Sequence, residues 1–291
     1  MAHGSLALLS AIGLLGLAAC SAGGKQRLHD ETQTIQMLRE NTRNGAVASL
    51  DEQRFSRSAA SEGLWHPDRF IARSSTGIYF LEPYDPGRTP VLFVHGYEGS
   101  PRDFSYLIAK LDKTRFQAWV YNYPSGLRLG LLAGHLESAL DELRLRYRFD
   151  CVSIVAHSMG GLVTRGFLLR NAVAATPECV PLFVSISTPW QGNWAASIGA
   201  RWAPDLVSTW RDIAPGSSYL RSLFAAPFPD NTRYCLVYTS DDRTITVASQ
   251  LGLAARQDAA QVIGYDATHV GVLLDADAVT GLMRLLEQSA Q

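Results

Sequence analysis

The sequence predicts an α/β protein in which helices flank a mostly parallel central sheet. From Thr89 onward, short apolar runs of strand length alternate with longer stretches of helical periodicity. This alternation is typical of a parallel sheet covered by helices. The chain has 291 residues, 47% of them hydrophobic and 18% charged, and a chain of this size can bury one large core. We therefore expect one α/β domain over residues 76–291.

The expected elements follow one another along this domain. Runs rich in β-branched residues predict strands, and apolar positions three or four residues apart predict helices. The expected strands are residues 91–94, 116–121, 152–156, 182–186, 236–238 and 261–263. The expected helices are residues 101–111, 131–147, 162–169 and 278–286. Residues 20–75 are polar and mixed, and we expect a tether and packing segment there, with a helix over 32–50.

The first residues have the features of an export signal. Residues 6–19 are apolar but too short to cross a bilayer as a helix. They end in Leu17-Ala18-Ala19-Cys20, which resembles the bacterial lipobox. The resemblance implies that residues 1–19 are removed, that Cys20 carries a lipid anchor, and that the chain sits in the bacterial cell envelope, at the outer membrane. A plain secretory signal, giving a soluble periplasmic or secreted protein, is the alternative, and residues 1–5 lack the usual Lys or Arg.

Three further cysteines stand at or just before expected strands. With Cys20 assigned to lipid, Cys151, Cys179 and Cys235 remain, and an odd number cannot all pair in an oxidising compartment. A disulfide between Cys179 and Cys235 is one expectation. Three inert buried thiols are the other.

Charge and residue spacing exclude two classes of partner. The formal net charge is -1, so the chain has no basic footprint for nucleic acid. No His, Cys or acidic residues have the spacing of metal ligands. We expect neither nucleic acid nor a catalytic metal.

One serine has the sequence context of an enzymatic nucleophile. A nucleophile at a sharp strand-to-helix turn needs small residues two places before and after it, and residues 156–160, Ala-His-Ser-Met-Gly, provide them around Ser158. Ser61 and Ser197 match the same local pattern. Only Ser158 follows an apolar strand and opens into an apolar helix. A helix-capping serine is the alternative interpretation of Ser158.

A glycine-containing loop, residues 95–99, follows the first expected strand. Such a loop can direct a backbone N–H at a substrate carbonyl oxygen, where negative charge develops in the transition state. The expected donors are the N–H groups of Tyr97 and Met159. An ordinary strand-to-helix turn is the alternative.

A seryl hydroxyl needs a base, and the base needs a carboxylate to orient it. His269 is the one histidine after Ser158, and it follows the last expected strand. His157 is expected to be structural. Of the acidic residues between Ser158 and His269, Asp241 and Asp242 stand at the end of an apolar strand. Both are candidates for the acid.

The segment from about 190 to 232 interrupts the alternation and is predicted to be a cap or lid over the sheet. It holds four tryptophans. Trp190, Leu206 and Leu223 are candidates for lining an acyl pocket, and the cap could also touch lipid. Plain packing of the cap against the domain is the alternative.

From Thr89 onward the chain resembles bacterial serine lipases and esterases of the α/β-hydrolase superfamily. The resemblance rests on His95-Gly96, residues 156–161, the run Ser-Thr-Pro-Trp-Gln-Gly at 187–192, an acid and His269. The chain order of the family, Ser then acid then His, supports His269, and its Asp-x-x-Val form favours Asp242 over Asp241.

The resemblance implies ester hydrolysis through an acyl-serine, without a cofactor, by a carboxylesterase or lipase acting on a small-molecule or lipid ester. An acyltransferase or phospholipase with the same three residues is an alternative. So is a binding protein on a hydrolase fold.

Overall fold

The computed structural model describes residues 31–73, 76–203 and 206–289. The predicted export signal and Cys20 lie outside these residues. Within them, seven strands form one sheet in the order β1-β3-β2-β4-β5-β6-β7. The strands are β1 (Gly77–Phe80), β2 (Thr89–Val94), β3 (Phe116–Asn122), β4 (Ser153–His157), β5 (Leu182–Ile186), β6 (Arg233–Thr239) and β7 (Gln261–Tyr265). Only β1 pairs antiparallel, so the predicted α/β fold with a mostly parallel sheet is confirmed.

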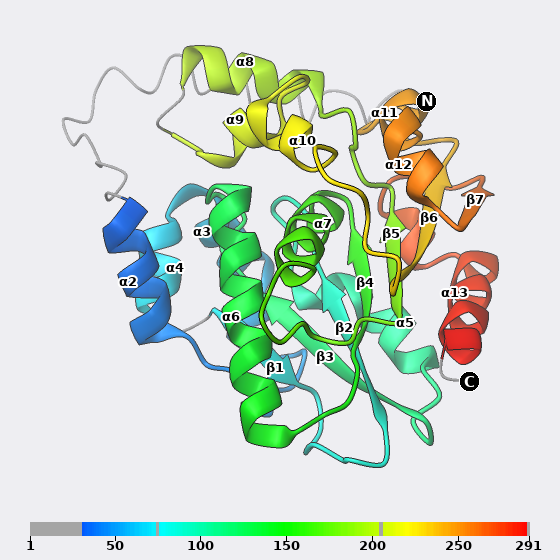
Figure 1. The fold of residues 1–291 in the computed structure, drawn as a ribbon. Coiled ribbons are helices and arrows are strands. Elements are labelled where there is room, and N and C mark those ends of the chain that lie inside the picture. The colour runs from blue at the N-terminus through cyan, green and yellow to red at the C-terminus, as the bar shows by residue number, and fades with distance from the viewer. Residues whose placement is uncertain (1–30, 74–75, 204–205, 290–291) are drawn as a thin grey trace.

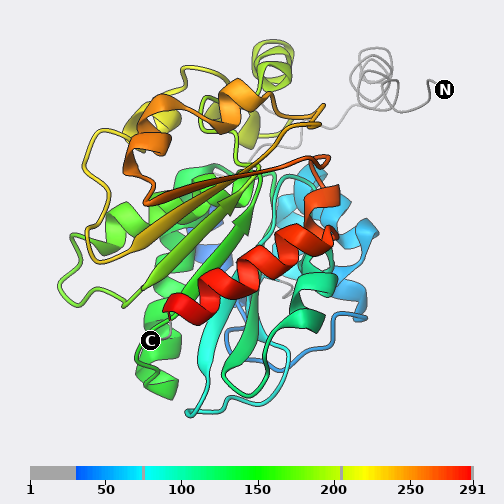
Figure 2. The ribbon, with the colours of Figure 1, turned by 90° about the vertical axis from the view of Figure 1, so that its right-hand side faces the viewer.

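Helices cover both faces of the sheet (Figure 1). On one face lie α6 (Leu129–Tyr147) and α7 (Met159–Asn171), and on the other lie α5 (Ser105–Lys110) and α13 (Ala276–Ser289), which crosses the sheet in Figure 2. Alternate residues of β2 enter different cores: Leu92 packs with the α6 and α7 side, and Phe93 with the α5 and α13 side. This is the side-chain alternation of a strand buried on both faces.

The remaining helices lie before the sheet and around its carboxyl edge. They are α2 (Glu31–Asn41), η1 (Gln53–Phe55), α3 (Arg57–Trp65), α4 (Pro67–Ala72), η2 (Pro101–Phe104), α8 (Trp194–Trp202), α9 (Thr209–Ile213), α10 (Ser218–Ser222), α11 (Val247–Gln250), α12 (Leu253–Asp258) and η3 (Gly271–Leu273). None of the described helices is long and apolar enough to cross a membrane. Helices α8 to α10 lie between β5 and β6, where the sequence predicts a cap.

The N-terminal helix is shorter than expected. It ends at Asn41 rather than at residue 50, because the chain that follows pairs with β1 instead. The N–H groups of Gly45 and Ala48 donate to the carbonyl groups of Ile78 and Phe80. Gly45 has a φ of 76°, which suits a glycine better than a helix interior. The segment thus extends the sheet locally and helps to bury β1.

The expected disulfide pairing is wrong. Cys179 bonds to Cys151, with Cα atoms 4.6 Å apart, while Cys235 is a buried free thiol. Cys151 and Cys179 face each other in a parallel bridge just before β4 and β5. Cys235 pairs in register with Val184, five residues beyond Cys179, so it lies too far along the strands to reach that cysteine.

Candidate active site

Three side chains from the carboxyl edge of the sheet form one hydrogen-bonded chain. Ser158 follows β4, Asp242 follows β6 and His269 follows β7. The Oγ of Ser158 lies 2.9 Å from His269 Nε2, and His269 Nδ1 lies 2.6 Å from Asp242 Oδ2. The structure therefore brings together the three residues selected from the sequence, over separations of 111 and 27 positions.

The backbone presents Ser158 on a strained turn. Its φ of 54° and ψ of -128° lie where a non-glycine residue costs about 1–3 kcal/mol, and such strain concentrates at functional sites. Two glycines make the turn possible. A Cβ on Gly160 would lie 2.4 Å from the backbone oxygens of Val94 and His95, and one on Gly96 would lie 2.8 Å from Ser158 Cβ. The pattern around Ser158 thus reflects close packing of α7 and the 95–99 loop against each other.

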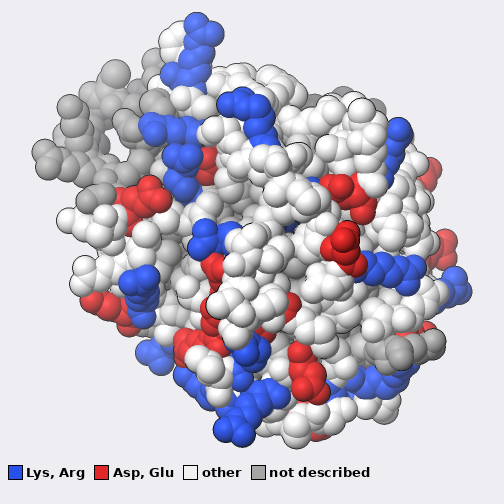
Figure 3. Space-filling model, in the orientation of Figure 1, with Lys and Arg blue, Asp and Glu red and all other residues white. Residues whose placement is uncertain are grey.

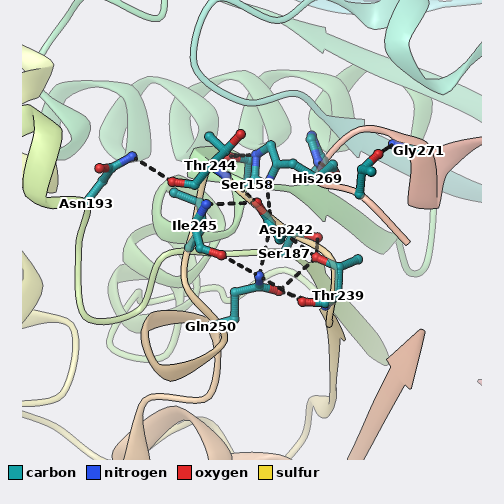
Figure 4. A network of polar contacts seen from close by, with 12 residues as sticks. Ser158, Ser187, Asn193, Thr239, Asp242, Thr244, Ile245, Gln250, His269 and Gly271 are labelled. Atoms are coloured by element: carbon teal, nitrogen blue, oxygen red, sulfur yellow. Dashed lines mark hydrogen bonds and ion pairs between the residues drawn. The ribbon is translucent and has the colours of Figure 1, made fainter. Parts of the chain in front are cut away.

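Asp242 is held as an ionised acceptor. Its Oδ1 accepts the backbone N–H groups of Thr244 and Ile245, both at 2.8 Å (Figure 4). Burial acts to raise its pKa, but the hydrogen bond and charge of His269 and these amides outweigh burial and lower the pKa below its usual value. A carboxylate only accepts, so His269 Nδ1 carries the proton and Nε2 can accept the Ser158 hydroxyl proton.

Asp241 does not compete for this place. Its side chain is exposed and faces Arg243 at 3.8 Å. Of the two candidate acids, Asp242 is the one that contacts His269.

Gln250 is a buried contact of Asp242 that sequence reasoning missed. Its Nε2 lies 3.0 Å from Asp242 Oδ2 and also donates to the Ile245 carbonyl, while its Oε1 accepts the Thr239 N–H. The Thr239 hydroxyl adds a further bond to Asp242 Oδ2 at 3.1 Å and lies 3.0 Å from Ser187 Oγ. No sequence motif marks Gln250, which becomes recognisable only when α11 packs against the end of β6.

His157 and His95 support the site as neutral side chains. Burial lowers the pKa of His157 to about 3 and that of His95 to about 4. His157 Nε2 donates to the backbone oxygen of His269 at 2.8 Å, so it holds the loop that carries His269. His95 stacks on Tyr123 with ring centroids 4.1 Å apart. The hydrogen bond from His157 to the His269 backbone agrees with the structural role expected of His157.

The two expected oxyanion donors belong to segments that adjoin Ser158. Met159 begins α7, where the first N–H groups of a helix have no intrahelical acceptor, and Tyr97 lies in the loop that holds Gly96. Within the described chain, neither N–H has a hydrogen-bond acceptor. Both are thus available to an oxygen bound beside Ser158.

Helix α9 contacts the side chains of these same two residues. Trp210 Nε1 donates to the Tyr97 hydroxyl at 2.9 Å, and the Thr209 hydroxyl lies 3.3 Å from Met159 Sδ. The helix is itself held by an ion pair between buried Asp212 and Arg128. The sequence identified Trp210 only as one of the cap tryptophans. Its contact with the 95–99 loop could not be foreseen.

The three residues expected to line an acyl pocket do not share one environment. Trp190 packs edge-on against Phe224 and Leu223 is buried, whereas Leu206 is exposed. Their contact with a substrate stays a prediction. The described residues include no cluster of three or more His, Cys, Asp or Glu that could hold a metal ion.

Comparison with known proteins gives one family match and several structural likenesses. The model of the alpha/beta hydrolase family matches residues 91–282. Aspergillus fumigatus lipase B is 16% identical with a TM-score of 0.56, covering 75% of this chain and 57% of that one. Bacillus licheniformis lipase BlEst2 is 17% identical with a TM-score of 0.51, covering 72% of this chain and 97% of that one. The type II thioesterase BorB from the borrelidin biosynthetic cluster is 16% identical with a TM-score of 0.53, covering 74% of this chain and 96% of that one. A search of curated proteins finds no match. At these identities the likenesses show the fold alone.

Proposed function

Because the chain belongs to the alpha/beta hydrolase family, we propose that it is a serine carboxylesterase or lipase. The observation that carries the proposal is the hydrogen-bonded chain from Ser158 through His269 to Asp242. Hydroxyl, imidazole and carboxylate in this order form the arrangement that activates a serine for acyl transfer. The strained turn at Ser158 and the two N–H groups beside it support the same reaction.

The geometry suggests how each bond would change. Ser158 Oγ attacks the ester carbonyl carbon while its proton passes to His269 Nε2, and ionised Asp242 stabilises the resulting imidazolium. The N–H groups of Tyr97 and Met159 bind the oxyanion, and each such donor typically contributes ~3 kcal/mol. The intermediate expels the alcohol, which takes the proton from His269. His269 then deprotonates a water molecule, which attacks the acyl-serine carbonyl. The carboxylic acid leaves, and Ser158 Oγ takes the proton back from His269.

Replacing Ser158 tests the proposal. Ser158→Ala should lower kcat on nitrophenyl esters by on the order of 10⁴-fold or more, while the circular dichroism spectrum and melting temperature stay close to those of the wild type. Ser197→Ala is the matched control, because it removes the serine of an equivalent motif outside the site. Activity of Ser158→Ala near that of the wild type would contradict the proposal.

A chain-length series of these esters, measured with and without a lipid interface, distinguishes an esterase from a lipase. Product analysis with an added alcohol distinguishes hydrolysis from transfer, because an acyltransferase would yield the new ester instead of the free acid.

A further inference from the structure

Helix α8 presents a row of large apolar side chains to solvent. Trp194, Ile198 and Trp202 are 60%, 36% and 77% exposed, and their spacing of four residues places them on one side of the helix. Leu206, 44% exposed, lies shortly after the helix. Single exposed apolar residues are ordinary, but a contiguous row marks a surface that meets a partner or a membrane.

The opposite side of α8 is packed, so the orientation of this row is fixed. A Cβ on Gly199 would lie 2.3 Å from the ring of Trp210, which means that the helix lies directly on α9. Ala196 is buried on the same inner side. Small residues therefore face the protein and large apolar residues face outward, the reverse of an ordinary surface helix.

Positive charge accompanies the apolar row. The exposed charged side chains of α8, α9 and α10 are Arg201, Arg211 and Arg221. The one acidic residue of these three helices, Asp212, is buried and paired with Arg128. In the view of Figure 3, the charged side chains over α8 belong to Lys or Arg. The Arg201 guanidinium lies 5.6 Å from the ring centre of Trp202, so cationic and aromatic groups adjoin.

We propose that the outer face of α8, formed by Trp194, Ile198 and Trp202 with Arg201, docks on the surface of an anionic phospholipid bilayer. Tryptophan favours the boundary between headgroups and acyl chains, where its ring is apolar and its N–H stays hydrated. Arginine pairs with lipid phosphate and is attracted by an anionic leaflet. Within the described residues of α8, the exposed tryptophans are accompanied by one charged side chain, Arg201, and this combination complements an anionic surface. The inference does not depend on which ester the site hydrolyses.

Quenching by brominated lipids tests the contact at α8 itself. The full chain, with its N-terminus unchanged in every variant, is mixed with vesicles of brominated phosphatidylcholine, with and without phosphatidylglycerol. We expect strong quenching of tryptophan fluorescence on the anionic vesicles and most of it to be lost in Trp194→Phe/Trp202→Phe. The other tryptophans are buried or half-buried, so Trp65→Phe, the control, should be quenched as the wild type is.

Vesicle sedimentation tests how much the outer face of α8 contributes to the affinity for anionic vesicles. Trp194→Ser/Trp202→Ser should weaken binding to anionic vesicles at least tenfold, and Arg201→Glu or 0.5 M salt should also weaken it. Leu145→Ser/Val173→Ser, which removes equally exposed apolar side chains elsewhere, should bind as the wild type does. Unchanged melting temperatures show that the variants are folded.

Two results would overturn the proposal. One is quenching that is the same with and without Trp194 and Trp202. The other is a wild-type dimer that Trp194→Ser/Trp202→Ser converts to monomers, because a second copy of the chain would then cover this face.

Discussion

Asp242 accepts five hydrogen bonds in the candidate site. His269, Thr239, Gln250 and two backbone amides direct hydrogen bonds at its two oxygens. These contacts keep it ionised and hold one tautomer of His269. In the reaction proposed above, Ser158 therefore depends on a carboxylate that it does not contact.

Asp242→Asn should lower kcat by about 10⁴-fold, because an amide stabilises the wrong tautomer of His269 and cannot balance its positive charge. Asp241→Asn, one position away and exposed, is the matched control and should keep the activity of the wild type. Ester hydrolysis under saturating substrate measures both. Equal losses in the two variants, or none in Asp242→Asn, would show that the hydrogen bond to His269 does not serve catalysis.

Among single residues, the sequence predicts those that a motif or the order along the chain identifies. Ser158 needs small neighbours and a strand before it, and His269 follows from chain order. Asp241 and Asp242 are adjacent and chemically identical, and in the sequence only the resemblance to the Asp-x-x-Val form favours Asp242. In the structure, the turn after β6 directs Asp242 to His269 and leaves Asp241 exposed. Gln250 is recognisable by its partners alone, because its amide contacts residues brought close by folding.

Among the helices, α9 links the cap to the candidate oxyanion donors. The Trp210 Nε1 group donates a hydrogen bond to the Tyr97 hydroxyl. Gly199 of α8 packs against the six-membered ring of the same Trp210 side chain. Burial raises the pKa of the Tyr97 hydroxyl to about 12, so this group stays a neutral hydrogen-bond partner. The position of α9 therefore influences the loop that carries the Tyr97 N–H.

Trp210→Phe should lower kcat about 2- to 10-fold with little change in KM, because one neutral hydrogen bond that positions the loop is lost. Tyr97→Phe removes the other partner of the same bond. Kinetics of both variants and of the double variant measure the coupling. We expect the double variant to lose no more than either single one. Fully additive losses would show that the two side chains act independently.

The strands were easier to predict than the short helices. Parallel strands buried on both faces are continuous apolar runs, which the sequence displays directly. Strand β1 was missed because it is four residues long and follows a polar segment. Helices α9 to α12 have four to six residues, too few for a helical period to appear. The disulfide required strand register, which no spacing of cysteines reveals.

Across the whole molecule, buried histidines link the N-terminal segment, the sheet and the site. His135 of α6 lies 2.7 Å from Thr42 Oγ1 and 2.8 Å from the Tyr121 hydroxyl. Burial lowers its pKa to about 4, as it does for His95, and lowers that of His157 to about 3. All three are neutral in the folded chain at pH 7.

The free energy of unfolding should therefore fall as the pH decreases from 6.5 toward 4. The unfolded chain binds protons on these histidines in this range and the folded chain does not, so acid favours unfolding. Between pH 7 and pH 5, the free energy of unfolding should fall in both proteins. The fall should be about 2 kcal/mol smaller in His135→Gln than in the wild type. Urea denaturation at both pH values measures the difference. An identical pH dependence in the two proteins would mean that His135 is not neutral when buried.

The central claim is that Ser158 is an activated nucleophile, and covalent labelling tests it most directly. A fluorophosphonate reacts with such a serine by losing fluoride, and mass spectrometry of the digested chain locates the adduct. We predict one adduct on the peptide that contains Ser158, none in Ser158→Ala and much slower labelling in Asp242→Asn. Failure of the folded wild-type chain to be labelled, or an adduct on another serine with Ser158 unmodified, would contradict the account.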